Sequence, residues 1–95
     1  MRKIEEKMCA AVRAHEEYKC GNTWVHVDDY GNLFVFLHGN CIYSEVDGKK
    51  SFSLAGWNTG TTRSRLNALG VHVSQKNFAP MYNGNEIDCN KLYNI

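Results

Sequence analysis

The chain has 95 residues, of which 43% are hydrophobic and 12% aromatic, a composition typical of a folded globular protein. This length supports one hydrophobic core, so we predict a single domain over residues 1–95. The formal net charge of +1 argues against an acidic DNA mimic and against a strongly basic nucleic-acid coat protein. A local basic patch remains compatible with that charge.

Two features of the sequence bear on location. No apolar run approaches the ~20 residues of a membrane span, and the charged segment 2–7 lacks the apolar core of a signal peptide. We therefore expect a cytoplasmic protein with no membrane partner. Cys9, Cys20, Cys41 and Cys89 contain no C-x-x-C pair, so in a reducing compartment they are expected to be free thiols.

Residues 1–19 are predicted to form an amphipathic helix. Apolar or ring-bearing side chains recur there at steps of three and four, at Ile4, Met8, Ala11, Val12, His15 and Tyr18. Gly21 and Asn22 are expected to stop the helix. The pattern favours packing on the core, and a helix that binds a partner or a second copy is the alternative.

From Thr23 the period of the apolar residues becomes two, which predicts four antiparallel strands within residues 23–55. Turns are expected at residues 29–32, at Gly39-Asn40 and at Asp47-Gly48. Segment 33–38 is apolar on both faces, so we expect both of its faces to be covered. In segment 49–54, Phe52 and Leu54 should point inward and both serines outward.

A short central helix is predicted after this meander, followed by three short strands at 71–75, 78–82 and 86–89. The expected turns between these strands are Lys76-Asn77 and Asn83-Gly84. Pro80 suggests an edge strand, because proline has no N–H to donate to a ladder. Helix, four strands, helix and three strands together predict an α+β fold with an antiparallel sheet and the helices on one face.

The central stretch, residues 56–70, is the strongest candidate for a binding site. Thr61 or Thr62 is expected to cap the helix, Leu66 and Leu69 to pin it to the sheet, and Gly70 to end it. Arginines and hydroxyls near a helix N-terminus form an environment that attracts anions. The candidate binding residues are Trp57, Asn58, Thr59, Thr61, Thr62, Arg63, Arg65 and Asn67. The same residues also suit a purely structural cap with solvated arginines and a core tryptophan.

Motifs for metal or covalent chemistry are weak. Zinc ligands usually come in closely spaced pairs, and the nearest Cys/His pairs here are His15 with Cys20 and His38 with Cys41, the second of which flanks a predicted turn. No nucleophile, base and orienting group form a recognisable motif, and no P-loop or dinucleotide fingerprint is present. We therefore expect a protein that is not an enzyme and holds neither metal nor cofactor.

The central stretch resembles a segment of a group of small bacteriophage proteins of uncharacterised activity. These proteins carry G-W-x-T-x-T-T-[RK]-S-R-L-N-A-L after a hairpin with an L-H-G-N turn, corresponding here to residues 56–69 and 37–40. The resemblance spans about residues 33–88 and ends in a turn like Tyr82-Asn83-Gly84-Asn85. It implies a phage origin and the cytoplasm of a bacterial host, and it implies no particular activity.

Two functions follow as hypotheses. The first is a non-enzymatic phage accessory protein that binds and modulates a host protein or complex, as an anti-defence or host-takeover factor. The second is a protein that binds DNA or RNA, with Arg63 and Arg65 contacting phosphates, Lys49, Lys50 and Lys76 nearby, and Phe34, Tyr43 and Trp57 available for stacking. The near-neutral charge favours the first hypothesis. Edge strands and the N-terminal helix also offer surfaces for a homodimer.

Overall fold

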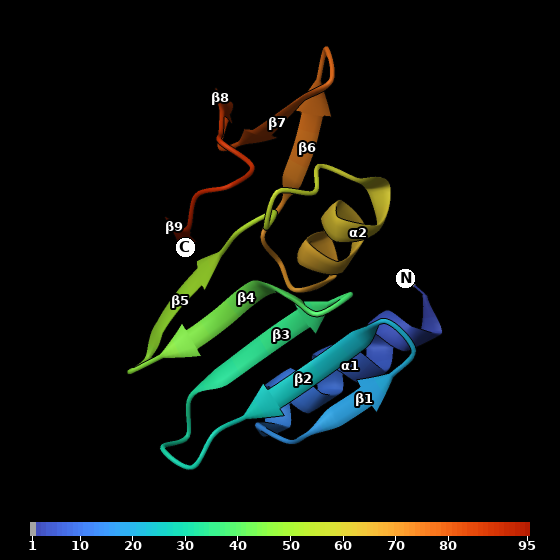
Figure 1. Ribbon diagram of the computed structural model, residues 1–95, viewed down its shortest axis with the longest axis vertical. Helices are drawn as coiled ribbons and strands as arrows, with labels where there is room; N and C mark the ends of the chain where they lie inside the picture. The colour runs from blue at the N-terminus through green and yellow to red at the C-terminus, as the bar shows by residue number, and fades with distance from the viewer. Residues whose placement is uncertain (1) are drawn as a thin grey trace.

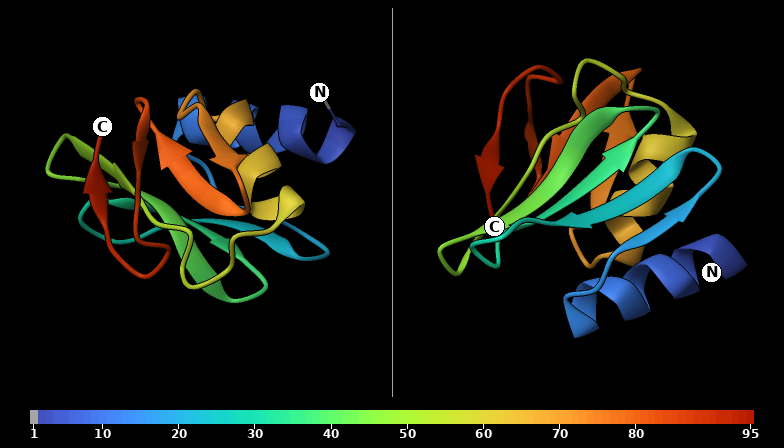
Figure 2. Two further views of the ribbon diagram at one scale, coloured as in Figure 1. Left: turned by 90° about the horizontal axis from the view of Figure 1, so that it is seen from above. Right: turned by 60° about the horizontal axis from the view of Figure 1, so that its bottom comes forward.

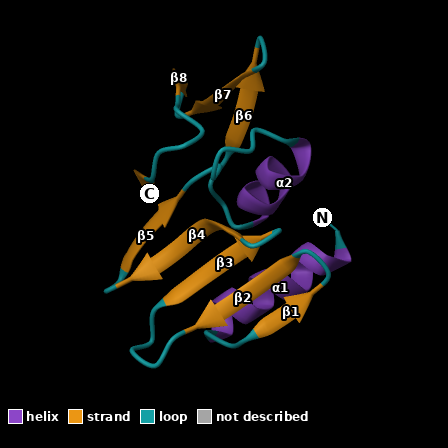
Figure 3. Ribbon diagram, viewed as in Figure 1, coloured by secondary structure: helices purple, strands orange, loops and turns teal. Residues whose placement is uncertain are grey.

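The computed structural model describes residues 2–95, so Met1, the first residue of the predicted N-terminal helix, lies outside the described residues. Figure 1 shows the two helices beside a large curved sheet and a smaller sheet, and Figure 3 separates helices from strands by colour. The α+β class predicted from the sequence is confirmed. The elements are α1 (Lys3–Ala14), β1 (Tyr18–Cys20), β2 (Thr23–Val27), β3 (Leu33–Leu37), β4 (Asn40–Val46), β5 (Lys49–Phe52), α2 (Gly60–Ala68), β6 (Val73–Lys76), β7 (Ala79–Tyr82), β8 (Asn85–Glu86) and β9 (Tyr93–Asn94).

The N-terminal helix is shorter than the sequence predicted. It ends at Ala14; the next residue, His15, adopts a left-handed conformation with φ of 53°, and the amide of Glu16 donates to the carbonyl of Ala11 over 3.0 Å. This closure resembles a Schellman motif with histidine in the place where glycine is usual. Tyr18 therefore lies in strand β1, and Gly21-Asn22 forms the turn between β1 and β2 and does not stop the helix.

The four-stranded meander is confirmed as β2 to β5. β1 extends it at one edge and β9 at the other, giving a six-stranded antiparallel sheet in the order β1-β2-β3-β4-β5-β9. Two hairpin turns of this sheet have positive φ at both central residues, the geometry that suits the strand twist. One is Asp47-Gly48 as predicted, whereas the other is His38-Gly39, one residue earlier than predicted.

Both helices cover one face of the six-stranded sheet, as expected. Figure 2 shows them on the same side, with the smaller sheet also above that face. α1 packs on β1 and β2, and α2 packs on β4 and on α1. The core between these layers is fully or almost fully buried at Met8, Val25, Leu33, Val35, Ile42, Phe52, Leu54 and Leu66.

The prediction that both faces of segment 33–38 are covered is wrong, and the serines of segment 49–54 are less exposed than predicted. Phe52 and Leu54 are buried as predicted. Ser51 lies on the opposite face as predicted, but Ser51 and Ser53 are buried as well. Their hydroxyls are satisfied, because Ser51 Oγ lies 2.9 Å from Ser44 Oγ and Ser53 Oγ accepts the amide of Ala55. Strand β3 is covered on one face only, since within residues 2–95 no helix or second sheet covers the opposite face.

The last three predicted strands form a sheet of their own in the order β6-β7-β8. Pro80 lies in the central strand, contrary to the predicted edge position. Its missing N–H is tolerated because β8 pairs only with Met81 and Tyr82, while the carbonyl of Pro80 accepts the amide of Ile87. Asn77-Phe78 forms the β6–β7 turn, so Phe78 is 91% exposed and not in a strand. Asn83-Gly84 is the turn predicted.

None of the helices formed by residues 2–95 combines the length and the apolar character needed to cross a bilayer. The four cysteines are free thiols: Cys9 is buried, Cys20 is exposed, and Cys41 and Cys89 are half-buried.

The end of α2 agrees with the sequence. The amide of Gly70 donates to the backbone carbonyl of Asn67, and the amide of Val71 donates to the backbone carbonyl of Leu66, each over 3.0 Å. Gly70 has φ of +90°. This is a Schellman motif, with the buried pair Leu66 and Val71 providing its apolar contact.

The two glycines that flank α2 give a matched test of this ending. Gly70→Ala is expected to destabilise the protein by about 1 kcal/mol, because alanine disfavours the left-handed conformation. Gly60→Ala is expected to stabilise it by a few tenths to ~1 kcal/mol, because Gly60 lies at the helix start with an ordinary φ and open space around it. Urea unfolding measures both values, and equal effects of the two substitutions would contradict the assignment.

Candidate functional site

The loop before α2 is shaped by a tight turn at Ala55-Gly56. Both residues have positive φ, 53° and 83°, and the amide of Trp57 donates to the carbonyl of Leu54 over 2.9 Å. A Cβ atom at position 56 would lie only 3.0 Å from Asn90 Oδ1. The backbone amide of Gly56 donates to the backbone carbonyl of Cys89. The turn therefore requires glycine and directs the next residue, Trp57, outward, where its side chain is 59% exposed.

The helix cap is Thr59, not Thr61 or Thr62 as predicted. Thr59 Oγ1 accepts the amide of Thr62 over 3.2 Å and lies 3.0 Å from the Thr62 hydroxyl. Thr59 has extended backbone angles, which suit a cap, while Thr61 and Thr62 already lie in the first helical turn. This arrangement buries Thr62 and leaves Thr61 half-exposed.

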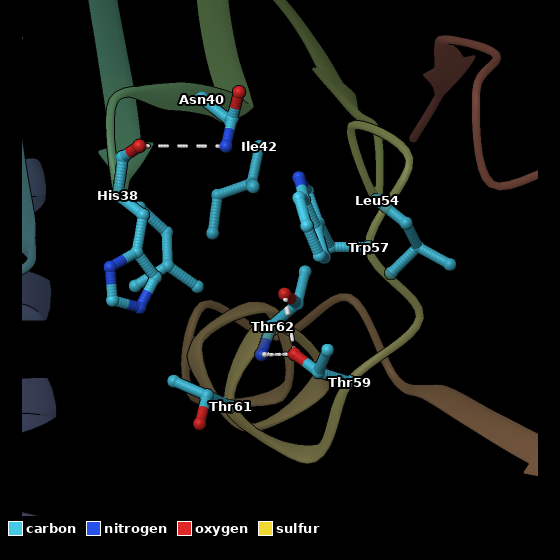
Figure 4. A pocket seen from close by; sticks show the side chains of 9 residues that line it. His38, Asn40, Ile42, Leu54, Trp57, Thr59, Thr61 and Thr62 are labelled. Carbon is cyan, nitrogen blue, oxygen red and sulfur yellow. Dashed lines mark hydrogen bonds between the residues drawn. The ribbon is translucent and has the colours of Figure 1, made fainter.

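A cavity of about 450 Å³ opens between this loop and the β3–β4 turn. Figure 4 shows the Trp57 ring along one side of it, across from His38 and Ile42, with Thr62 at the helix end. The apolar lining is almost fully buried at Leu37, Ile42 and Leu54, and polar side chains line the rest. The lining residues are Leu37, His38, Asn40, Ile42, Leu54, Trp57, Thr59, Thr61 and Thr62. We call this feature the Trp57 cleft.

The cleft joins the two sequence segments that carry the phage resemblance. Leu37, His38 and Asn40 come from the hairpin turn, and the remaining polar wall comes from the loop and first turn of α2. Four of the lining residues were predicted as site residues from the sequence, namely Trp57, Thr59, Thr61 and Thr62. The other five were not predicted: Leu37, His38, Asn40, Ile42 and Leu54. The L-H-G-N turn was the available signal, since both segments belong to the same resemblance.

Arg65 lies in the core, contrary to the exposed position expected for it. Its side chain is 4% exposed, and NH1 lies 2.8 Å from Oε2 of Glu5, which is itself 3% exposed. Arg65 Nε also donates to Thr23 Oγ1 over 3.1 Å, and Ser64 Oγ donates to Glu5. The guanidinium is thus committed to an ion pair between α2 and α1.

The ion pair changes the titration of Glu5. Burial alone would raise the pKa of this carboxyl, but the hydrogen bonds from Ser64 and Arg65 outweigh burial and hold the pKa below its ordinary value. Glu5 is therefore charged at neutral pH and balances the charge of Arg65. Two hydrogen-bonded opposite charges explain how both side chains are accommodated in the core.

The other polar residues of the motif also make internal contacts. Arg63 NH1 donates to Asn58 Oδ1, and Asn58 Nδ2 donates to the carbonyl of Phe78 over 3.3 Å. Asn67 Oδ1 accepts the amide of Val73 over 2.6 Å. Asn58, Arg63 and Asn67 thus connect α2 to the second sheet and lie outside the Trp57 cleft. Lys49, Lys50 and Lys76 lie in β5 and at the end of β6, also outside it.

Within residues 2–95, no three His, Cys, Asp or Glu side chains gather as a metal site would require. His38 and Cys41, a pair considered from the sequence, therefore have no third ligand of these types beside them. The expectations of no metal, no cofactor and no enzymatic activity remain predictions.

The fold and the cleft define a small α+β protein with a recessed apolar site beside an exposed tryptophan. A family model described as Kyanoviridae Gp96 protein matches residues 1–94, so the chain belongs to this family of phage proteins. No curated protein and no solved structure matches the chain. The predicted phage origin is thereby confirmed, while the G-W-x-T-x-T-T-R-S-R-L-N-A-L pattern as a mark of the group stays a prediction.

The ion pair leads to a stability prediction. Arg65→Ala is expected to destabilise the protein by roughly 3–5 kcal/mol at neutral pH, because it leaves the Glu5 carboxylate buried without its counter-charge. Arg63→Ala should cost much less, because Arg63 is only half-buried and bonds a side-chain amide. Urea unfolding of both variants measures the difference, and similar losses would contradict a special role for Arg65.

The same variants predict a pH effect with a defined sign. Because the folded pKa of Glu5 is lowered, its contribution to stability is present above the unfolded pKa and is lost as pH falls through the folded pKa. In Arg65→Ala the lowered pKa should become a raised one, so protonation of Glu5 relieves part of the loss. The difference in the free energy of unfolding between wild type and Arg65→Ala should therefore become smaller as the pH is lowered. A difference that stays constant or grows as the pH is lowered would contradict this role of the ion pair.

Proposed function

We propose that this phage protein binds a host protein or complex through the Trp57 cleft and modulates it, as an anti-defence or host-takeover factor. The observation that carries the proposal is Trp57 itself, a large ring that is 59% exposed beside an apolar cavity of about 450 Å³. Tryptophan is enriched among the residues that dominate the binding energy of protein interfaces.

The layout of the cleft supports an apolar side chain of a partner as its occupant. Leu37, Ile42 and Leu54 form the almost fully buried apolar floor of the recess beside the exposed Trp57 ring, and polar groups of His38, Asn40, Thr59 and Thr61 surround it. An apolar centre with a polar rim is the usual anatomy of a protein interface. The lining contains no Lys, Arg, Asp or Glu, so a partner would not have to neutralise a full charge there.

Phosphate binding by the arginines of α2 receives less support. That alternative requires two free guanidinium groups near the helix start, but Arg65 is buried against Glu5 and Arg63 bonds Asn58. Fewer guanidinium groups are therefore free to contact a phosphate than the sequence suggests. A host protein seated beside Trp57 needs neither group.

The test is an affinity pull-down from host lysate, treated with nuclease, with wild type and two matched variants. Trp57→Ala should reduce recovery of the host partner by thirtyfold or more, on the order of 2 kcal/mol or above for a dominant interface residue. Tyr30→Ala should retain it, because Tyr30 is also aromatic and 91% exposed but lies outside the cleft. Circular dichroism should show both variants folded.

A second variant tests the cleft without removing the tryptophan. Thr61→Arg places a long side chain at the half-exposed wall of the cavity and should block it, with the same loss of partner. The proposal fails if the partner persists with Trp57→Ala and Thr61→Arg, if Tyr30→Ala loses it equally, or if nuclease releases it.

A further inference from the structure

The face of the six-stranded sheet opposite the helices carries an aromatic cluster that the Trp57 cleft does not use. Strand register places Trp24 and His26 of β2 beside Phe36 and Phe34 of β3 on this face. Within residues 2–95 no helix or second sheet covers them (Figure 2), and all four side chains are half-buried, mainly against one another. We call this surface the outer sheet face.

The rings form a two-by-two array. Trp24 and Phe36 are stacked, with centroids 5.0 Å apart and planes 27° apart. His26 and Phe34 are nearly parallel at 24°, but their centroids are 6.5 Å apart. That separation exceeds the 5.0 Å between Trp24 and Phe36, so the His26–Phe34 pair is the looser half of the array. Because both side chains are only half-buried, they keep ring surface on which a planar base can stack.

Positive charge accompanies the rings. Lys19 lies over Trp24, with Nζ 5.4 Å from the ring centroid. Ser51 lies on the same face as Phe34, because both residues pair with Ser44. Lys49 shares this face, because side chains two residues apart in a strand point to the same side. Within strands β1 to β5 no carboxylate lies on this face, but Asp28, directly after β2, lies near His26 and accepts the amides of Tyr30 and Asn32. Glu17 at its rim already accepts from the Val27 amide, the Trp24 indole and the His26 ring.

We propose that the outer sheet face binds single-stranded nucleic acid, with a base held at the His26–Phe34 pair and the phosphate backbone running past Lys19 and Lys49. Base stacking on aromatic side chains of a sheet, combined with cations along the backbone, is a general mode of single-strand recognition. A second copy of the chain fits less well, because self-pairing would cover the lysines of both copies without supplying carboxylates from strands β1 to β5 to them.

The experiment measures fluorescence anisotropy of labelled oligo-dT and oligo-U at low ionic strength, with a duplex of matched length as comparison. Wild type should bind at least one of the single strands more tightly than the duplex, and raised salt should weaken binding. Phe34→Leu keeps apolar bulk but removes the ring faces, so it should weaken binding about tenfold. Phe78→Leu is the matched control, because Phe78 is 91% exposed on the turn between β6 and β7 and should not matter.

A variant that leaves the aromatic packing intact covers the case in which Phe34→Leu fails to fold. Lys19→Gln changes an exposed side chain and should lower the salt dependence by about one phosphate contact. The inference is overturned if wild type binds neither single strand at low salt, or if Phe34→Leu and Phe78→Leu bind alike. It is also overturned if light scattering shows a dimer that Phe34→Leu dissociates, because the face would then hold a second copy.

Discussion

The buried ion pair between Glu5 and Arg65 is the interaction on which the arrangement of the two helices depends. It connects residues 60 positions apart in the chain, and both side chains are less than 5% exposed. Arg65 also reaches Thr23 at the start of β2, and Ser64 adds a bond to Glu5. The pair therefore fixes α1, α2 and the sheet relative to one another. A buried ion pair contributes little net stability, but losing one partner is costly because the other charge stays buried.

The position of α2 in turn determines the Trp57 cleft. The helix begins at Gly60 beside the β3–β4 turn, so its first turn supplies one wall of the cavity and that turn supplies another. Asn58 and Arg63 hold the preceding loop to the second sheet, and Thr59 caps the helix. Most polar residues of the motif thus position the loop, and Trp57 is the large side chain that they leave exposed.

The features predicted correctly from the sequence are mostly those that depend on residues close together in the chain. Alternation of apolar residues identified the strands of the meander, and Asp47-Gly48 and Asn83-Gly84 marked turns that glycine makes accessible. Gly70 was correctly predicted to end α2, because its positive φ is also a conformation that glycine makes accessible. The end of α1 was missed because His15 adopts the left-handed conformation without being glycine. The burial of Arg65 was missed because its partner, Glu5, lies in another helix, and local pattern carries no signal of such pairing.

The site was predicted in part for the same physical reason. Trp57, Thr59, Thr61 and Thr62 were named from one continuous segment, whereas Leu37, Ile42 and Leu54 join them only through sheet packing. The sequence predicted that both faces of segment 33–38 are covered, and only the register with β2 shows Phe34 and Phe36 beside Trp24 and His26 on the uncovered face. The two surfaces share no residue.

A contact between Trp57 and a host protein during infection can be captured by site-specific photo-crosslinking. A photoreactive phenylalanine analogue would be introduced at position 57, and separately at the exposed position 30, in protein expressed in infected host cells. We expect a discrete covalent adduct with one host protein from position 57, resistant to nuclease, and none from position 30. No adduct at position 57, or the same adducts from both positions, would contradict the proposed contact.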